Sequence, residues 1–406
     1  MTDLGGEDYD VIIVGAGMVG ASAACLLAQV KYASQNRALK IALIESTAGK
    51  PFDNEVFDPR VAAVTERSRQ ILESCGVWHN IEQLRASPYL AMQVWDAEST
   101  GRIDFDCHAI HQPNLGHIVE NSVIVQTLLT QIETLDNVDL ICPSTICDYQ
   151  NDDQSISVHL DDGRWLTAAL LIAADGANSK VRQHFEVETN EWSYHQEAIV
   201  TTIETQNSNQ QTAWQCFTQK GPLALLPLNN NGDLHRSSIV WSQESATAKS
   251  LMALSDEQFG AELSKSSEYC LGNVVTIEKR FSFPLIQRHA IDYVMPRIAL
   301  VGDAAHSIHP LAGQGVNMGF SDVEVLVEEL VRALRRGNDI GDKLILARYQ
   351  RRRKPDNLAA MALMEALNKL FIADQLPLRF LRSLGMSRLN KFNAVKNELI
   401  KLAMGL

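Results

Sequence analysis

The feature that most constrains the fold is the glycine-rich turn Gly15-Ala16-Gly17-Met18-Val19-Gly20, because of what stands on either side of it. Before it, Tyr9 to Val14 (YDVIIV) is a short β-branched run, which is typical of a strand buried on both faces. After it, small residues from Met18 to Val30 predict a helix, and Lys40 to Glu45 (KIALIE) predicts a second buried strand. The chain therefore opens with one βαβ unit.

Each glycine of this turn has a distinct task in a dinucleotide site. Gly15 permits the tight turn, Gly17 lets the backbone approach a pyrophosphate, and Gly20 lets helix and strand pack closely. The helix N-terminus faces the phosphate charge, and Glu45 is placed to accept hydrogen bonds from an adenosine ribose. In this setting a dinucleotide site is favoured over a purely structural turn, but the motif alone does not separate FAD from NAD.

A second motif, Ala173 to Arg182 (AADGANSKVR), follows another buried run and contains Asp175. Taken alone, it is equally consistent with a capped helix start. A third motif joins Gly302 to His306 (GDAAH) with Pro310 to Gly319 (PLAGQGVNMG) and leads into a helix. Its glycines, proline and amides indicate a backbone that lies against a ligand, with free N–H groups that can stabilise the charge of a reduced flavin. Asp303, just after the strand IALV, can bind a ribityl hydroxyl.

The remaining pattern alternates between two kinds of sheet. Residues 91 to 106 predict a β-hairpin, and residues 195 to 283 predict a mostly antiparallel domain of short alternating segments. Further elements are expected as a helix over 122 to 132, buried strands over 165 to 174 and 298 to 301, and helices from Ser321 to the end, interrupted at Pro355 and Pro377.

The charge and the cysteine content argue against several classes of function and kinds of site. The net charge of -13 over 406 residues argues against a nucleic-acid partner. The densest basic run, from Arg348 to Lys354, is interpreted as a solvated helix face or as a contact with anionic lipid. Seven scattered cysteines without a Cys-x-x-Cys pair favour a reducing compartment and predict no metal site. The expected location is the cytoplasm, with peripheral contact at the inner membrane as an extension.

The three motifs, in this order and spacing, resemble those of flavin-dependent aromatic hydroxylases of the para-hydroxybenzoate hydroxylase type, and among them the ubiquinone-biosynthesis hydroxylases. The likeness covers nearly the whole chain. Further family-like segments are Asp58-Pro59-Arg60, Glu120-Asn121 followed by Gln126, Gly221 to Leu228, Phe283-Pro284-Leu285 and the tail from Arg348 to Gly385.

The resemblance implies an α/β (α+β) fold in which a Rossmann-like FAD-binding domain is interleaved with a mostly antiparallel substrate domain. The expected divisions are 1–78, 110–185 and 284–350 for the FAD-binding domain, 79–109 and 186–283 for the substrate domain, and 351–406 for a helical C-terminal region. It also implies non-covalent FAD, with its adenosine end on the first motif, its ribityl chain on Asp303 and its isoalloxazine facing 310–317. The cofactor-binding residues expected in full are Gly15, Gly17, Gly20, Glu45, Arg60, Gln126, Asp175, Asp303, Gly313, Gly315, Val316 and Asn317.

By the same resemblance, NAD(P)H binds transiently and reduces the flavin, O₂ adds to give a C4a-hydroperoxyflavin, and a phenol ring attacks its distal oxygen. The expected substrate is a polyprenyl phenol of ubiquinone biosynthesis, held in a closed pocket, and other enzymes of that pathway are expected partners. The absence of a second Gly-x-Gly-x-x-Gly after a strand counts against a two-dinucleotide reductase. Alternatives are another single-component flavin enzyme (phenol hydroxylase, epoxidase, halogenase or reductase) or a scaffold subunit that keeps FAD for structure.

The catalytic base is not identified by the sequence. Pro310, Gly315 and His306 are candidates near the flavin, although a histidine beside a glycine-rich loop, such as His306 or His309, more often orders the backbone than transfers a proton. The tail after Pro355 is interpreted as core packing or as a membrane-contacting surface near Arg379 and Arg382. Its apolar residues are Leu363, Leu367, Leu370, Phe371, Phe380, Leu381 and Leu384.

Overall fold

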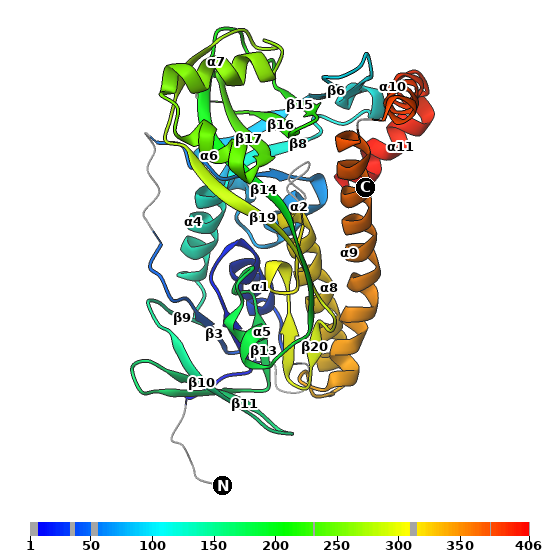
Figure 1. Ribbon diagram of the computed structural model, residues 1–406. Coiled ribbons are helices and arrows are strands. Elements are labelled where there is room, and N and C mark those ends of the chain that lie inside the picture. The colour runs from blue at the N-terminus through cyan, green and yellow to red at the C-terminus, as the bar shows by residue number, and fades with distance from the viewer. Residues whose placement is uncertain are drawn as a thin grey trace.

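The computed structural model of the chain describes residues 7–32, 37–49, 56–229, 232–308, 315–373 and 375–405 (Figure 1). Its centre is a six-stranded sheet in the order β20-β21-β13-β2-β3-β9, parallel except for the short edge strand β20. These strands are β2 (Val11–Val14), β3 (Ile41–Ile44), β9 (Val138–Ile141), β13 (Leu170–Ala173), β20 (Val294–Met295) and β21 (Ile298–Leu300). The βαβ unit expected at the start of the chain is confirmed.

Helix α1 (Met18–Ala28) packs against both α4 (Asn121–Ile132) and α8 (Gly315–Arg335) beside this sheet. Most of α1 is buried, because its small alanines and Gly20 let the neighbouring elements approach it closely. Helix α8 begins at Gly315, earlier than the helical periodicity from Ser321 indicates. The C-terminal ends of β2, β13 and β21 therefore meet the N-terminal ends of α1 and α8 at one edge of the sheet, where ligands bind in open α/β sheets.

A nine-stranded sheet forms the second layer, in the order β22-β19-β14-β17-β16-β15-β6-β7, with β18 paired to β14. The predicted hairpin is present as β6–β7, and a parallel pairing of β6 with β15 joins it to this sheet, so segments from 91–106 and 195–283 share one sheet. Its strands are β6 (Ala91–Asp96), β7 (Arg102–Asp106), β14 (Thr189–Thr205), β15 (Thr212–Thr218), β16 (Gly221–Pro227), β17 (Arg236–Glu244), β18 (Val274–Ile277), β19 (Phe281–Ala290) and β22 (His306–Ser307).

Two small sheets complete the β-structure, and one of them corrects a prediction. Residues 165 to 174 are not one strand, because the chain bends at Ala169 and passes from one sheet to another. A continuous apolar run predicts that a segment is buried, but not which sheet it joins. Both 165–168 and 170–173 are largely buried, and they belong to different sheets. One small sheet is β1 (Glu7–Asp8), β12 (Trp165–Ala168), β11 (Ile156–Leu160) and β10 (Ile146–Asn151), and the other is β4 (Val61–Val64), β8 (Gly116–Glu120) and β5 (Ala86–Tyr89).

The smaller helices cap the sheets and connect them. Those near the parallel sheet are α2 (Glu66–Ser74), α3 (Trp78–Arg85) and α5 (Lys180–His184), while α6 (Ser245–Met252) and α7 (Asp256–Ser266) pack on the large sheet. Short 3-10 turns are η1 (Cys107–Ile110) and η2 (Gly302–Ala304).

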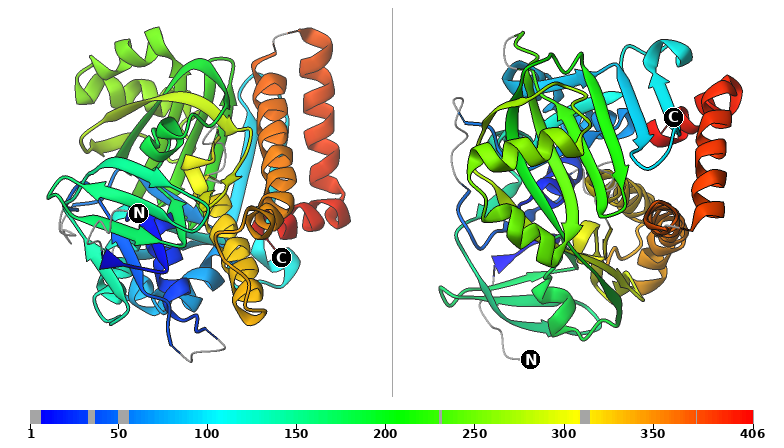
Figure 2. Two further views of the ribbon diagram at one scale, coloured as in Figure 1. Left: turned by 90° about the horizontal axis from the view of Figure 1, so that it is seen from below. Right: turned by 45° about the horizontal axis from the view of Figure 1, so that its top comes forward.

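The C-terminal region consists of α9 (Lys343–Ile372), α10 (Leu376–Lys391) and α11 (Asn393–Met404), which stand together on one side of the molecule (Figure 2). The predicted interruption at Pro355 is wrong, because α9 runs through it. Tyr349, Arg353, Asn357 and Met361 form one buried stripe across the proline, and this packing offsets the hydrogen bond that proline cannot donate. Pro377 does mark a boundary, since it lies in the first turn of α10.

Candidate active site

The glycine turn has the geometry expected of a pyrophosphate cradle. Gly15 has φ +98°, and a Cβ there would lie 2.5 Å from the carbonyl oxygen of Ala174. A Cβ on Gly20 would lie 1.9 Å from the carbonyl oxygen of Gly15, so both positions require glycine. A Cβ on Gly17, by contrast, meets nothing within 4 Å. Gly17 is also the N-cap of α1 and no side chain caps this helix start, which leaves its N–H groups open to an anion.

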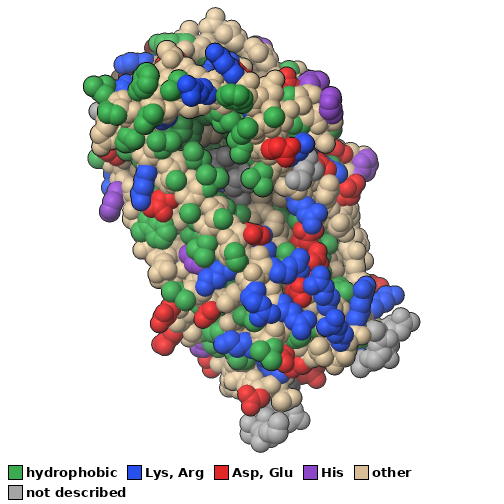
Figure 3. Space-filling view, turned by 90° about the vertical axis from the view of Figure 1, so that its right-hand side faces the viewer, with side chains coloured by type: hydrophobic (Ala, Val, Ile, Leu, Met, Phe, Trp, Pro, Cys, Tyr) green, Lys and Arg blue, Asp and Glu red, His purple; other side chains and the backbone are tan. Residues whose placement is uncertain are grey.

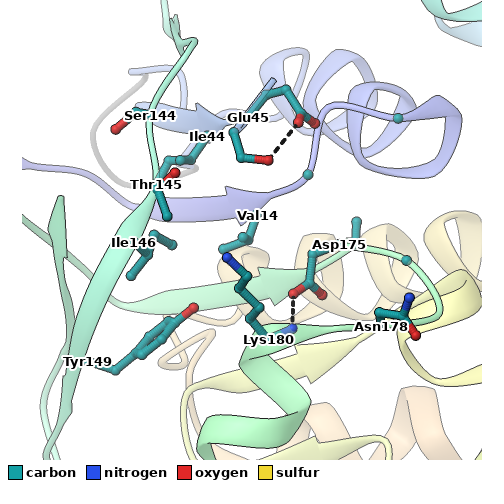
Figure 4. Close-up of a pocket in the computed structure, with 15 residues that line it drawn as sticks. Val14, Ile44, Glu45, Ser144, Thr145, Ile146, Tyr149, Asp175, Asn178 and Lys180 are labelled. Carbon is teal, nitrogen blue, oxygen red and sulfur yellow. Dashed lines mark hydrogen bonds between the residues drawn. The ribbon is translucent and has the colours of Figure 1, made fainter. Parts of the chain in front are cut away.

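A cavity of about 360 Å³ begins at this turn and extends over the ends of β2, β3 and β13 (Figure 4). Glu45 lines it at the end of β3, where its Oε2 accepts a hydrogen bond from the N–H of Ala16 at 2.8 Å. Asp175 lines it after β13, with Oδ2 accepting from the N–H of Lys180 at 2.8 Å. The other oxygen of Asp175 is buried and has no hydrogen-bond partner among the described residues. A buried carboxylate oxygen without a donor is the state expected where a ligand supplies one.

A second cavity, of about 490 Å³, continues from the first and shares Gly17, Ala174 and Gly176 with it. Asp303 projects into this second cavity from η2, immediately after β21. The Asp303 side chain is exposed to the open trough; the protein packed around it raises the pKa of the carboxyl through desolvation, while His306 and Arg288 act in the opposite direction. The two cavities together make one trough from Glu45 to Asp303.

The second cavity also presents polar atoms that the protein does not use. Asn121 Oδ1 and Ser307 Oγ are buried there without a hydrogen-bond partner among the described residues. Gly315 and Val316, at the start of α8, line its far side, and a Cβ on Gly315 would meet nothing within 4 Å. Glycines with free space beside them, and buried polar atoms without a hydrogen-bond partner in the described protein, are what an elongated, polar dinucleotide requires along its binding site.

A third cavity, of about 360 Å³, shares the lining residue Val61 with the second and is lined mainly by apolar side chains. Tyr89 is among its few polar residues, and burial raises the pKa of its phenol to about 12. The walls come from the large sheet on one side and from α9 and α11 on the other, with Leu367, Leu399, Ile400, Ala403 and Met404 closing it. Sequence reasoning placed a pocket beside the antiparallel domain but missed its α11 wall, since nothing local in 393–404 indicates what that helix faces.

The other expected site residues lie in different surroundings. Arg60 and Val316 line the second cavity. Asn317 turns away from it, since its side chain bonds the backbone of Thr65 and Ala63. Gln126 bonds Thr130 on α4 and is not among the residues lining the three cavities. Pro310 and Gly313, like His309, lie outside the described residues.

His306 is buried away from the trough. Its Nε2 donates to Asp322 at 2.5 Å, and the residue is 1% exposed. This arrangement favours the backbone-ordering role over direct proton transfer to a substrate. Among the described residues, Asp106, Cys107 and His108 could together hold a metal ion, but Asp106 already caps η1 and bonds His108 at 2.8 Å, and none of the three lines these cavities.

Comparison with known proteins decides whether the dinucleotide that binds in this trough is FAD or NAD. Residues 8–364 match the family model described as "FAD binding domain". The chain is 36% identical to the 3-demethoxyubiquinol 3-hydroxylase of Escherichia coli, covering 98% of this chain and 99% of that protein. It is 35% identical to the mitochondrial ubiquinone biosynthesis monooxygenase COQ6 of Xenopus tropicalis, covering 99% and 95%. The chain belongs to the ubiquinone-biosynthesis hydroxylases. It is thus an FAD-dependent monooxygenase.

Solved structures show the same fold at lower sequence similarity. The p-nitrophenol 4-monooxygenase of Pseudomonas putida superposes with a TM-score of 0.78 at 18% identity, covering 97% of each chain. A probable FAD-dependent monooxygenase of Pseudomonas aeruginosa superposes with a TM-score of 0.75 at 21% identity, covering 94% of this hydroxylase and 100% of that chain. The interleaved architecture expected from the motifs is confirmed. FAD is the cofactor, and the open glycines and unused polar atoms of the trough suit it.

Proposed function

We propose that this hydroxylase adds oxygen to the aromatic ring of a polyprenyl phenol in ubiquinone biosynthesis, using NAD(P)H and O₂. The observation that carries the proposal is that Val61 lines both the apolar cavity and the dinucleotide trough, so the two lie on either side of one residue. This neighbourhood supports a site in which a prenylated ring lies beside the flavin end of the trough in apolar surroundings that exclude water. The names of the relatives, which describe enzymes acting on ubiquinone precursors, support the same substrate class.

FAD would lie along the trough, with its adenosine end near Glu45 and its ribityl chain near Asp303. FAD bound there would supply the redox chemistry between NAD(P)H and O₂ that protein side chains lack. The start of α8 at Gly315 and Val316 places backbone N–H groups against the far side of the second cavity. Those dipoles stabilise negative charge at that end of the trough without any reorganisation.

The protein's own part in the hydroxylation is to orient the ring and to keep the site dry. Leu226, Ile118 and Met404 contribute apolar walls from three separate elements. Tyr89, with its raised pKa, stays a neutral phenol at physiological pH and can exchange hydrogen bonds with a substrate hydroxyl.

The test measures NAD(P)H oxidation with and without a prenylated phenol, under labelled O₂. Oxidation is expected to be slow alone and to accelerate with the phenol, with one labelled oxygen atom appearing in the ring. Ala224→Leu, which adds bulk inside the apolar cavity, is expected to lower the stimulation, whereas Ala246→Leu on the exposed face of α6 is not. Label entering from water, or no hydroxylated product, would remove the proposal and leave the FAD fold.

We also propose that the face carrying α9, α10 and α11 contacts the membrane that holds the substrate. Figure 3 shows hydrophobic side chains around a hollow on the upper half of this face, and Lys and Arg side chains gathered below. Highly exposed apolar residues here include Leu363, Leu376, Phe380, Leu381 and Leu402. No helix within the described residues is long and apolar enough to cross a bilayer.

Two residues of the C-terminal tail follow the core-packing interpretation instead and do not belong to this surface. Phe371 is buried and stacks on Phe217 with ring centroids 3.8 Å apart. Arg382 is also buried, pairing with Asp96 at 2.7 Å, because it anchors α10 to the β6–β7 hairpin. The basic run on α9 is partly neutralised, since Arg352 Nη1 lies 2.8 Å from Glu328 and from Glu329.

Flotation with anionic liposomes tests the membrane proposal. Phe380→Ser/Leu381→Ser is expected to reduce flotation, while Tyr269→Ser, which changes an exposed aromatic residue on the far domain, is not. Equal flotation of all three folded proteins, or none by the wild type, would contradict it.

A further inference from the structure

Asp322 is a fully buried carboxylate on α8 that receives hydrogen bonds from three other segments of the chain. Its Oδ2 accepts from the N–H of Gly302 at 3.1 Å and from His306 Nε2 at 2.5 Å. Its Oδ1 accepts from Arg353 Nε at 2.8 Å and from Asn357 Nδ2 at 3.1 Å, both on α9. Each oxygen therefore has two donors, which is the arrangement that makes a buried carboxylate tolerable.

The two bonds to Oδ2 hold the two ends of one short turn. Gly302 and His306 flank Asp303, the residue that projects into the second cavity. The turn is confined on its other side as well: Gly302 has φ +56°, and a Cβ on it would lie 3.2 Å from Val19 of α1. The position of the Asp303 carboxylate therefore depends on where Asp322 holds these two residues.

The charge on Asp322 is secured by the same neighbours. Burial alone would raise the pKa of this carboxyl, but His306 and Arg353 outweigh that effect and lower it. Asn357 extends the network, since its Nδ2 also lies 3.3 Å from the hydroxyl of Tyr293, which in turn bonds His289 Nε2 at 3.0 Å. The turn that carries Asp303 is thus tied to α9 and β19 through one carboxylate.

We propose that Asp322 is a positioning residue for FAD binding, and that it acts through Asp303 by fixing the turn from Gly302 to His306. The inference rests on the proposed role of Asp303 at the ribityl chain. It assigns Asp322 no contact with cofactor or substrate, because its oxygens are already occupied by protein donors.

A double-mutant cycle on FAD affinity tests this proposal, with apoprotein titrated by FAD and flavin fluorescence as the readout. Asp303→Ala is expected to raise the Kd for FAD on the order of tenfold, because it removes a charge-assisted hydrogen bond to the cofactor. Asp322→Asn is expected to raise the Kd on the order of tenfold as well, because it displaces Asp303 from that bond. If Asp322 acts through Asp303, the double variant should bind FAD within about twofold of Asp303→Ala alone. A purely structural role predicts instead that the two losses multiply, and that result would overturn the proposal.

The control is Asp339→Asn, which breaks a carboxylate pair with the buried Arg297 at 2.6 Å, away from the trough. It is expected to lower the stability of the apoprotein while leaving the Kd for FAD unchanged. If Asp322→Asn fails to fold, the same double-mutant cycle is run with His306→Ala in its place. That variant keeps the Asp322–Arg353 ion pair and removes one of the two hydrogen bonds that hold the turn. Unchanged FAD affinity in Asp303→Ala would instead reject the proposed role of Asp303 at the ribityl chain, whatever the other variants show.

Discussion

Arg182 and Ala304 join two motifs that lie 122 positions apart in the chain: Arg182 Nη1 donates to the carbonyl oxygen of Ala304 at 2.8 Å. The Nη2 of the same guanidinium donates to the carbonyl oxygen of Ala177 at 2.7 Å. One buried side chain thus connects the turn after β13 with the turn that carries Asp303. Both turns line the dinucleotide trough, so their spacing depends on this arginine.

We expect Arg182→Lys to destabilise the apoprotein by about 2 kcal/mol and to weaken FAD binding. Lysine keeps the charge, but it lacks the planar fork that reaches both carbonyl oxygens at once. Urea unfolding and FAD titration measure the two effects, with Arg164→Lys on the exposed β11–β12 hairpin as the control. Wild-type behaviour of Arg182→Lys would show that the bridge is dispensable.

Glu45→Ala is expected to weaken FAD binding by about 1 to 3 kcal/mol, because the trough loses a charged acceptor at its adenosine end. Asp303→Ala should have a similar effect at the other end. Since the two side chains line different cavities, their losses should add in the double variant. Retained FAD measured by absorbance after gel filtration provides the check, and full retention by both single variants would disprove the residue assignment.

Two glycine substitutions are expected to separate folding from flavin chemistry. A side chain on Gly315 points into open space within the second cavity, so Gly315→Val should leave the apoprotein folded, let FAD bind through the Glu45 end, and strongly reduce phenol-stimulated turnover. Gly20→Ala places a Cβ 1.9 Å from the carbonyl oxygen of Gly15 and should lower the stability of the apoprotein itself. Thermal unfolding and steady-state turnover, measured on both variants, would contradict this view if the two behaved alike.

His117 is expected to make stability fall at mildly acidic pH. Desolvation lowers the pKa of this buried imidazole from 6.5 to about 4, so the unfolded chain binds a proton in that interval and the folded chain does not. The contribution of neutral His117 to the free energy of unfolding is therefore complete above pH 6.5. It declines by about 1.4 kcal/mol per pH unit as the pH falls from 6.5 towards 4. Urea unfolding of wild type and His117→Phe between pH 7 and 5 should show this component absent from the variant; parallel pH profiles would refute it.

Pro355→Ala is expected to raise the free energy of unfolding by about 1 to 3 kcal/mol, because alanine restores a backbone donor inside α9 and relieves the clash of the proline ring. The buried stripe on either side of it, from Tyr349 to Met361, should keep the helix in place. Chemical denaturation compares the two proteins, and a lower stability in the alanine variant would indicate that the packing requires the proline.

Much of the nucleotide-binding half follows from local sequence. The run from Tyr9 to Val14, the turn at Gly15 and Gly20 and the helix after it are specified by backbone sterics and burial, which operate over a few neighbouring residues. For the same reason the chain positions of Glu45 and Asp303, at the ends of buried strands, could be predicted without coordinates.

Only the tertiary structure decided which distant residues meet. The sequence by itself determined the three motifs and their order, and from them the dinucleotide fold. It did not indicate that Asp322 would hold the turn at Gly302, that Arg182 would reach Ala304, or that α11 would close the apolar cavity. Hydrophobic periodicity predicts that a side chain is buried, but it does not predict which residue that side chain contacts. The contact partner depends on how sheets and helices from separate parts of the chain pack together.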